Sequence, residues 1–513
     1  MPEFATLRSV RWTAAALCVL AFGQVAAKHC GVQPRSLPIT NYTLGDGVAL
    51  NRGIFVQIGG EALSLRISTG FSNTRLRNRR DCQQGNATAE SGCVGASGSI
   101  FDLDKSNTWQ RAAAGAWNVS VVDPREPGET ILEGWDVAQF GAGPSIPSFP
   151  LEVWSNQASE NKSGLAFGPE SSFLDWFLLA KQVPSKVFGI FFGSRSQLQG
   201  IDGNVTIGGY DRARVNGPWT NFSMEARYLN SPCPLQVLIK DIRLNIVNGS
   251  FSLFQDPGTT LGMCIDPLQN GFTLTNSMYD VVANVTRQSG VITSAGQPTY
   301  LSSLDGYLGN LSITLANGYE TLIPHYELVS QVRGTDSEGK YSVVDPTRLT
   351  MALNYNQNTT VPTLGGVFLS QNYLLVDYEN QMFGLAPAVV GNLGNQAHDI
   401  VTVCNATTSS ADTPKDAKKN TSAIVGGVIG GVIGVVILGG FLLYIIRTKK
   451  TARQKKPKAA QPSLANEQGS LISSHPPRFV SAETYEVDAS HGVSEVPGER
   501  EVAELQANKG LMV

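Results

Sequence analysis

The stretch from Gly53 to Thr74, GIFVQIGGEALSLRISTGFSNT, contains two short apolar runs that are separated by the turn residues Gly59 and Gly60. Runs of four to eight residues that are rich in Val, Ile, Leu and Phe, and that end at turn residues, are typical of β-strands. The stretch therefore predicts two consecutive strands, and the polar sequence Ser68-Thr69 stands at the end of the second one.

The same pattern recurs along most of the chain. Further runs of this kind are KVFGIFFG (186–193), NVTIGGYD (204–211), LQVLIKDIRLNIV (235–247), LSITLANG (311–318) and YLLVDYENQMFGLA (373–386). Only Ser172–Gln182 and Asn276–Gln288 have the composition of helices. We therefore predict a mainly β fold that is large enough for two lobes.

The overall composition excludes several classes of protein. The chain has 513 residues, of which 16% are charged, and its net charge is −3. A charged fraction of about 25% is usual for soluble domains, so this value is low. A net charge near zero removes the general argument for nucleic-acid binding, and we expect no nucleic-acid partner.

Both ends of the chain carry apolar segments of different lengths. Residues 1–27 have the order of basic, apolar and small residues that is typical of a cleaved signal peptide. Ala423–Ile446 is a run of 24 residues without a charge, and seven Lys or Arg residues follow it between Arg447 and Lys458. This predicts a transmembrane helix with the N-terminal part outside, in the plasma membrane or a membrane of the secretory pathway. Gly426, Gly430 and Gly434 have the spacing of a helix-dimer interface, which suggests a homodimer.

The distribution of glycosylation motifs and cysteines fits this topology. Twelve Asn-X-Ser/Thr motifs precede Ala423 and none follows it. Their asparagines are Asn41, Asn86, Asn118, Asn161, Asn204, Asn221, Asn248, Asn284, Asn310, Asn358, Asn405 and Asn420. Six cysteines remain outside the signal peptide: Cys30, Cys82, Cys93, Cys233, Cys264 and Cys404. An even number in an oxidising compartment predicts three disulfides, and because the spacing is not that of metal ligands we expect no zinc and no other cofactor.

From about Gly53 to Ala388 the chain resembles the pepsin-like aspartic proteases. GIFVQIGGEALSLRISTGFSNT resembles the family's strands and first active-site loop, and ILEGWDVAQFG resembles the strand after the flap. SGLAFGPESSFLDWF, KVFGIFFG, NVTIGGYD and TLGGVFLSQNYLLVDYENQMFGLAPA follow in the family's order. The resemblance implies a bilobal fold with a central cleft, and a small disulfide loop closed by Cys82 and Cys93.

In this family each lobe supplies an Asp-Thr-Gly loop, and the two carboxylates share a proton across a bound water. The first loop of this chain reads Ser68-Thr69-Gly70-Phe71, so Ser68 stands at the aspartate position. A hydroxyl has no useful basicity near neutral or acidic pH. The resemblance therefore implies that half of the catalytic pair is absent.

The second loop is placed best at MCIDPLQNGFTLTNSMYDVV, which puts Asp266 at the surviving catalytic position. Pro267 and Leu268 replace the family's Thr and Gly, and a side chain at residue 268 would obstruct a close backbone approach. Thr69 is then the only Thr that could brace the two loops. An alternative register uses Asp256-Pro257-Gly258-Thr259-Thr260, whose flanking residues fit less well.

Further absences also argue against hydrolysis. The family's flap carries a Tyr, but no Tyr occurs between Tyr42 and Tyr210. About 25 residues separate the expected cleavage site from GIFVQIGG, which leaves little room for a propeptide. His325 and His398 have no recognisable triad setting that could make Ser68 a nucleophile, and Asp104 and Asp136 are expected to be structural.

The sequence therefore predicts a cell-surface glycoprotein with a catalytically inactive, protease-like ectodomain that binds a peptide, protein or cell-wall ligand in its cleft. Two alternatives remain: a membrane-tethered aspartic endopeptidase with an unusual dyad, and a purely adhesive or structural wall protein. The expected organisation is 1–27 signal peptide, 28–225 N-terminal lobe, 226–405 C-terminal lobe, 406–422 stalk, 423–446 transmembrane helix and 447–513 disordered cytoplasmic tail.

Overall fold

The computed structural model describes most of the chain between Cys30 and Cys404. The described residues are 30–43, 50–83, 90, 93–94, 97–117, 130–155, 163–196, 200–224, 233–287, 298–335, 341–355, 361–391 and 397–404. None of the helices within these ranges has the length and apolarity that crossing a membrane requires. The expected signal peptide, transmembrane helix and cytoplasmic tail lie outside the described residues.

The described chain is mainly β, as predicted, and a 14-stranded sheet contains most of its N-terminal half. The strands that form this sheet are β1 (Arg35–Thr43), β2 (Leu50–Ile58), β3 (Glu61–Ser68), β4 (Thr74–Asn78), β5 (Ile100–Phe101), β6 (Gln110–Arg111), β7 (Thr130–Phe140), β8 (Ser145–Ser155), β9 (Gly164–Ala166), β10 (Phe188–Phe191), β11 (Gly203–Ile207), β13 (Thr220–Ser223), β25 (Asn372–Asp377) and β26 (Met382–Pro387). The predicted strands at 53–69 and 186–193 belong to it, and the run at 204–211 divides between β11 in this sheet and β12 in a small sheet.

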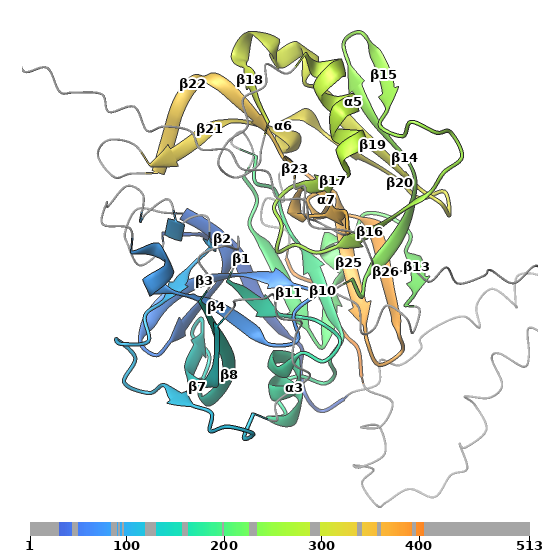
Figure 1. Cartoon of the computed structure of the whole chain (residues 1–513). Coiled ribbons are helices and arrows are strands. Elements are labelled where there is room, and N and C mark those ends of the chain that lie inside the picture. Colours follow the sequence, from blue (N-terminus) through green and yellow to red (C-terminus); the bar gives the residue numbers. More distant parts are fainter. Residues whose placement is uncertain are drawn as a thin grey trace, which may run out of the picture. The chain divides into compact units, whose positions relative to one another are not determined.

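A second sheet of eight strands contains most of the C-terminal half, drawn in green to yellow in Figure 1. Its strands are β14 (Gln236–Ile246), β15 (Gly249–Ser252), β16 (Leu261–Ile265), β17 (Phe272–Leu274), β19 (Asn310–Leu315), β20 (Glu320–Ile323), β23 (Leu353–Tyr355) and β24 (Thr363–Leu364). Two small sheets complete the β structure. They contain β18 (Thr299–Leu301), β21 (Val329–Thr335) and β22 (Tyr341–Met351), and β12 (Gly209–Asp211) with β27 (Ile400–Thr402).

The two halves of the sequence are joined by backbone hydrogen bonds in the larger sheet. Strand β25, which comes late in the chain, pairs antiparallel with β10, with Phe188 opposite Val376 and Ile190 opposite Leu374. Gly189 lies at this junction, where a Cβ atom would come within 2.6 Å of the Tyr373 hydroxyl. Only a residue without a side chain fits at this contact.

Both predicted helices are present and both are shorter than expected. Helix α3 (Ser172–Leu179) is capped by Ser171, whose hydroxyl accepts a hydrogen bond from the Leu174 amide. Helix α5 (Asn276–Thr286) is capped by Thr275 and ends at Arg287, which has the left-handed conformation that terminates helices (φ 54°). Further short elements are α6 (His325–Leu328), α7 (Gly366–Leu369), and the 3-10 turns η1 (Arg79–Cys82), η2 (Arg212–Arg214) and η3 (Ser302–Tyr307).

The interior is stabilised by apolar packing and by three disulfides. One continuous cluster of buried apolar side chains extends from Leu37 to Leu385 and includes residues of both large sheets. The disulfides are Cys30–Cys404, Cys82–Cys93 and Cys233–Cys264. The expected number of disulfides is confirmed, and so is the Cys82–Cys93 pairing that the resemblance implied.

Candidate functional site

The first loop of the candidate site begins at the end of β3. Ser68 is the last residue of this strand and pairs in parallel register with Ala166 of β9. The Phe167 amide donates to the Ser68 carbonyl at 2.8 Å, which fixes the backbone where the loop begins. The Ser68 side chain is fully buried.

The second loop has the same local architecture in the other sheet. Strand β16 ends at Ile265, pairs in parallel with β24, and is followed directly by Asp266. The Asp266 amide donates to the Leu364 carbonyl at 3.1 Å. In each half, therefore, a parallel strand pair ends at the candidate residue. This shared geometry makes Ser68 and Asp266 structural equivalents.

The Asp266 carboxylate accepts hydrogen bonds from both loops. The Ser68 Oγ donates to Oδ2 at 3.1 Å, and the Thr69 and Leu268 amides each donate to Oδ1 at 3.1 Å. The Gly70 amide in turn donates to the Ser68 Oγ at 3.2 Å. Ser68 thus lies beside Asp266, at the position where the resemblance to pepsin-like proteases implies a second acid. Hydrogen bonds of this kind favour the ionised form of a carboxyl group.

Thr69 connects the two loops from one side. Its Oγ1 donates to the carbonyl of Ile265 at 2.6 Å, and its side chain is buried. Position 267, which lies one residue after Asp266 as Thr69 lies one after Ser68, is occupied by Pro267. Proline has no hydroxyl, so it cannot make the reciprocal contact.

One apolar side chain from each loop lies against Gly164. Leu268 is buried, and a Cβ atom added to Gly164 would lie 2.8 Å from Leu268 Cδ1 and 3.0 Å from Phe71 Cε2. Phe71 in turn lies under the guanidinium of Arg75, 4.0 Å from the ring centre, and Arg75 also stacks over Trp154 at 4.1 Å. Leu268 and Phe71 therefore meet over Gly164, one from each loop.

A family model for eukaryotic aspartyl proteases matches residues 162–388. Residues 162–388 thus match a pepsin-like aspartyl protease domain. The matched residues include β9, the second loop with Asp266, and β26, whereas Ser68 precedes them. A search of curated proteins found no match.

Tyr378 is a buried residue of the protease-like domain to which the sequence pattern assigned no role. It follows β25, and its hydroxyl donates to the Phe167 carbonyl at 2.7 Å. Burial, and secondarily the nearby charge of Asp266, raise the pKa of Tyr378 far above its usual range. The phenol therefore stays protonated and holds the segment that follows Ser68. In the sequence Tyr378 is simply a Tyr after a strand, and no motif around it distinguishes it from an ordinary core residue.

The remaining acidic candidates lie apart from this site. Asp256 is exposed, and its carbonyl accepts a hydrogen bond from the Thr259 amide. The alternative register, which put Asp256 at the catalytic position, is therefore wrong, because Asp266 is the residue that lies beside Ser68. Asp136 is buried and accepts hydrogen bonds from the hydroxyls of Ser106 and Thr108, as a structural residue would. Residues 118–129, which precede β7, lie outside the described residues, so the flap is not described.

The imidazoles and Asp104 likewise take part in local pairs. His325 contacts Asp305 at 3.0 Å and His398 contacts Asp211 at 2.6 Å, while Asp104 pairs with Arg80 at 3.1 Å on the surface. Among the described residues, the Ser68 hydroxyl hydrogen-bonds to the Asp266 carboxylate and the Gly70 amide, and neither of these is an imidazole. Each of these side chains therefore has a partner other than Ser68.

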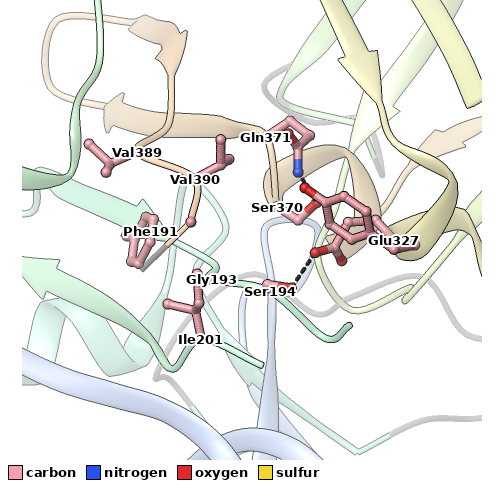
Figure 2. Close-up of a pocket in the computed structure, with 11 residues that line it drawn as sticks. Phe191, Gly193, Ser194, Ile201, Glu327, Ser370, Gln371, Val389 and Val390 are labelled. Atoms are coloured by element: carbon pink, nitrogen blue, oxygen red, sulfur yellow. Dashed lines mark hydrogen bonds between the residues drawn. The ribbon is translucent and has the colours of Figure 1, made fainter. Parts of the chain in front are cut away.

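The protease-like domain also has a small pocket, which is lined by residues from distant parts of the chain. Figure 2 shows Ser194 and Glu327 facing each other there, joined by a hydrogen bond from the Ser194 hydroxyl to a carboxylate oxygen. Glu327 lies on α6 and is only 7% exposed, and the Arg195 amide donates to its other oxygen at 3.4 Å. Burial raises the pKa of Glu327. The pocket thus contains a buried acid, but neither Ser68 nor Asp266.

Proposed function

We propose that the chain is a single-pass cell-surface glycoprotein whose pepsin-like domain is a pseudoprotease that binds a peptide, protein or cell-wall ligand in its cleft. The observation that carries this proposal is the hydroxyl of Ser68 at 3.1 Å from the Asp266 carboxylate. Hydrolysis by this fold needs one ionised carboxylate to activate water and one protonated carboxyl to donate to the substrate carbonyl. A serine hydroxyl supplies neither the negative charge nor the shared proton.

The second loop supports the same conclusion. Thr69 offers a hydroxyl to the second loop, but Pro267 has no hydroxyl to offer to the first. Leu268 occupies the position of the family's Gly, and its side chain lies against Gly164. Restoring activity would therefore require more than one new acid.

The cell-surface part of the proposal rests on the sequence outside the described residues. Ala423–Ile446 is long enough to span a bilayer, the basic residues that follow favour the cytoplasmic side, and all twelve glycosylation motifs precede it. The small-residue spacing at Gly426, Gly430 and Gly434 supports a homodimer within the membrane. Epitope tags at residue 406 and at the C-terminus test the topology: on intact cells an antibody should reach only the first tag. Detection of the C-terminal tag on intact cells would contradict it.

Gain of function tests the catalytic part of the proposal. We expect no peptide cleavage at pH 3–6 from the full-length Ser68→Asp variant, because Pro267 and Leu268 still replace the Thr and Gly of the family's second loop. The combined variant S68D/P267T/L268G restores the family's residues in both loops, and any activity should emerge there first. Cleavage by Ser68→Asp alone would show that the missing acid is the only defect and would contradict the role given to residues 267 and 268.

A membrane-tethered aspartic endopeptidase remains the second candidate, because one observation favours it. Asp266 keeps a hydrogen-bonded setting made by the Thr69 and Leu268 amides, as a surviving catalytic carboxylate would. This candidate predicts cleavage by the wild-type protein that disappears in Asp266→Asn, which keeps the size of the side chain but removes its charge.

A further inference from the structure

We propose that N-linked glycans are attached at Asn41, Asn221, Asn248 and Asn284, and that the folded protein carries none at Asn204. All five asparagines stand in Asn-X-Ser/Thr motifs, so the motif alone does not distinguish them. This inference rests on the proposed secretory route, and it adds to that proposal which positions are modified.

Asn204 lies inside the large sheet. It belongs to β11, which pairs on one side with β1, where Pro38 is opposite, and on the other side with β10, where Phe191 is opposite. Its side chain is 7% exposed and its Nδ2 donates to the Ser36 Oγ at 3.2 Å. A sugar attached to this nitrogen would replace one of its two N–H groups and would need space at a side chain that the fold leaves only 7% exposed.

Asn41 provides the contrast within the same sheet. It lies on β1, beyond Ile39, the last residue of that strand paired with β11, and its side chain is exposed. Among the strands that the structure describes, β2 alone pairs with β1 at this point, through Arg52. The amide nitrogen of Asn41 is thus accessible at a position where a bulky, solvated group disturbs no packing.

The other three sites lie in three different kinds of element. Asn221 is exposed on β13, which pairs with β26 and is the terminal strand of the large sheet within the described residues. Asn248 is exposed in the turn that joins β14 to β15, and Asn284 is exposed on α5. Asn310 is left out of the assignment because it is half-buried and its Oδ1 accepts from the Asn245 amide group at 2.9 Å.

The modification forms one bond and breaks one. The Asn Nδ2 attacks the anomeric carbon of a polyprenyl-diphosphate-linked oligosaccharide and loses one proton, while the bond from that carbon to the diphosphate oxygen breaks and polyprenyl diphosphate leaves. If this happened at Asn204 before folding, the chain would have to bury an oligosaccharide where the folded protein buries the Asn204 side chain. Molecules modified there would not reach the folded, exported pool.

The test is glycopeptide mass spectrometry on the full-length protein purified from the surface of eukaryotic cells. A peptide N-glycosidase in ¹⁸O-water converts each glycosylated Asn to a labelled Asp. We expect the label at Asn41, Asn221, Asn248 and Asn284 and none at Asn204. A label at Asn204, or an exposed site among the four without label, overturns the inference, whereas absence of label from every site overturns the secretory route itself.

Variants give a second readout that does not depend on peptide recovery. Asn221→Gln and Ser223→Ala each destroy the same motif at exposed positions, so both should increase electrophoretic mobility by one glycan. Asn204→Gln should leave the mobility unchanged. For Asn284 only the Asn284→Gln change is suitable, because Thr286 is buried and its hydroxyl donates to the Val282 carbonyl. A mobility shift in Asn204→Gln would contradict the assignment.

Discussion

At the scale of single residues, the candidate site is a carboxylate held by hydroxyl and amide donors. Asp266 accepts from the Ser68 hydroxyl and from two backbone amides, and these donors come from both loops. In an aspartic protease a second acid beside it would force the pair to share a proton. Here the neighbour is the Ser68 hydroxyl, which supplies no second carboxyl group.

Thr69→Val should destabilise the fold, because it removes the hydroxyl that donates to the buried Ile265 carbonyl at 2.6 Å. An unpaired buried carbonyl costs about 1–3 kcal/mol. Chemical denaturation of the full-length protein measures the loss in the free energy of unfolding. Thr69→Ser keeps the hydroxyl and is the control; equal stability of the Val and Ser variants would contradict the bracing role.

At the scale of elements, two strand pairs position the loops and a short helix carries a buried acid. β3 with β9 and β16 with β24 are the parallel pairs that end at Ser68 and Asp266. Away from them, α6 presents Glu327 to Ser194. Because burial raises the pKa of Glu327 above its ordinary value of 4.5, the folded protein binds this proton more tightly than the unfolded chain does.

The sign of the resulting pH dependence follows from that difference. The contribution of Glu327 to stability is fully present below the ordinary pKa and is lost as the pH rises through the raised pKa. Glu327→Gln removes this titration, so its melting temperature should fall less between pH 4 and pH 7 than that of the wild type. Thermal denaturation at the two pH values measures it, with the exposed Glu320→Gln as control. An unchanged pH dependence in Glu327→Gln would contradict the assignment.

At the scale of the whole molecule, the ends of the described chain are tied together. The Cys30–Cys404 disulfide spans 374 residues of sequence, whereas Cys82–Cys93 spans 11. The pairing of β10 with β25 also joins early and late segments. Of these links only the disulfide persists in the unfolded chain, and a disulfide restricts that chain most strongly when it encloses the longest loop.

Cys30→Ala/Cys404→Ala should therefore destabilise the protein more than Cys82→Ala/Cys93→Ala. Removal of a native disulfide typically costs about 2–5 kcal/mol, and in the chain-entropy description the cost grows with loop length. Equilibrium denaturation of both double variants compares them directly. A larger loss for the short loop would show that local packing, and not closure of the chain, dominates.

Much of the strand pattern was predictable because short apolar runs between turn residues identify strands locally. The four-residue helices α6 and α7 are too short to show a helical period. The partners of Cys30 and Cys233 could not be deduced, because an even number of cysteines does not define connectivity. The contact of Leu268 and Phe71 over Gly164 joins three segments distant in sequence, so no local pattern contains it.

The placement of Ser68 opposite Asp266 was suggested by resemblance and not by the residues alone. Neither Ser-Thr-Gly nor Asp-Pro-Leu identifies an active-site loop by itself. Both were assigned to such loops because the segments around them follow the order of the family. Tyr378 went unassigned because its hydrogen bond reaches 211 residues back to Phe167. Long-range hydrogen bonds of this kind depend on the packed fold.

The central claim is that this domain does not hydrolyse peptides, and one measurement tests it most directly. Full-length wild-type protein and Asp266→Asn are each incubated with a peptide library at pH 3–6, with and without pepstatin, and the products are counted by mass spectrometry. We predict that the two proteins yield the same background and that pepstatin changes neither. Pepstatin-sensitive cleavage by the wild type that is absent from Asp266→Asn would contradict the account.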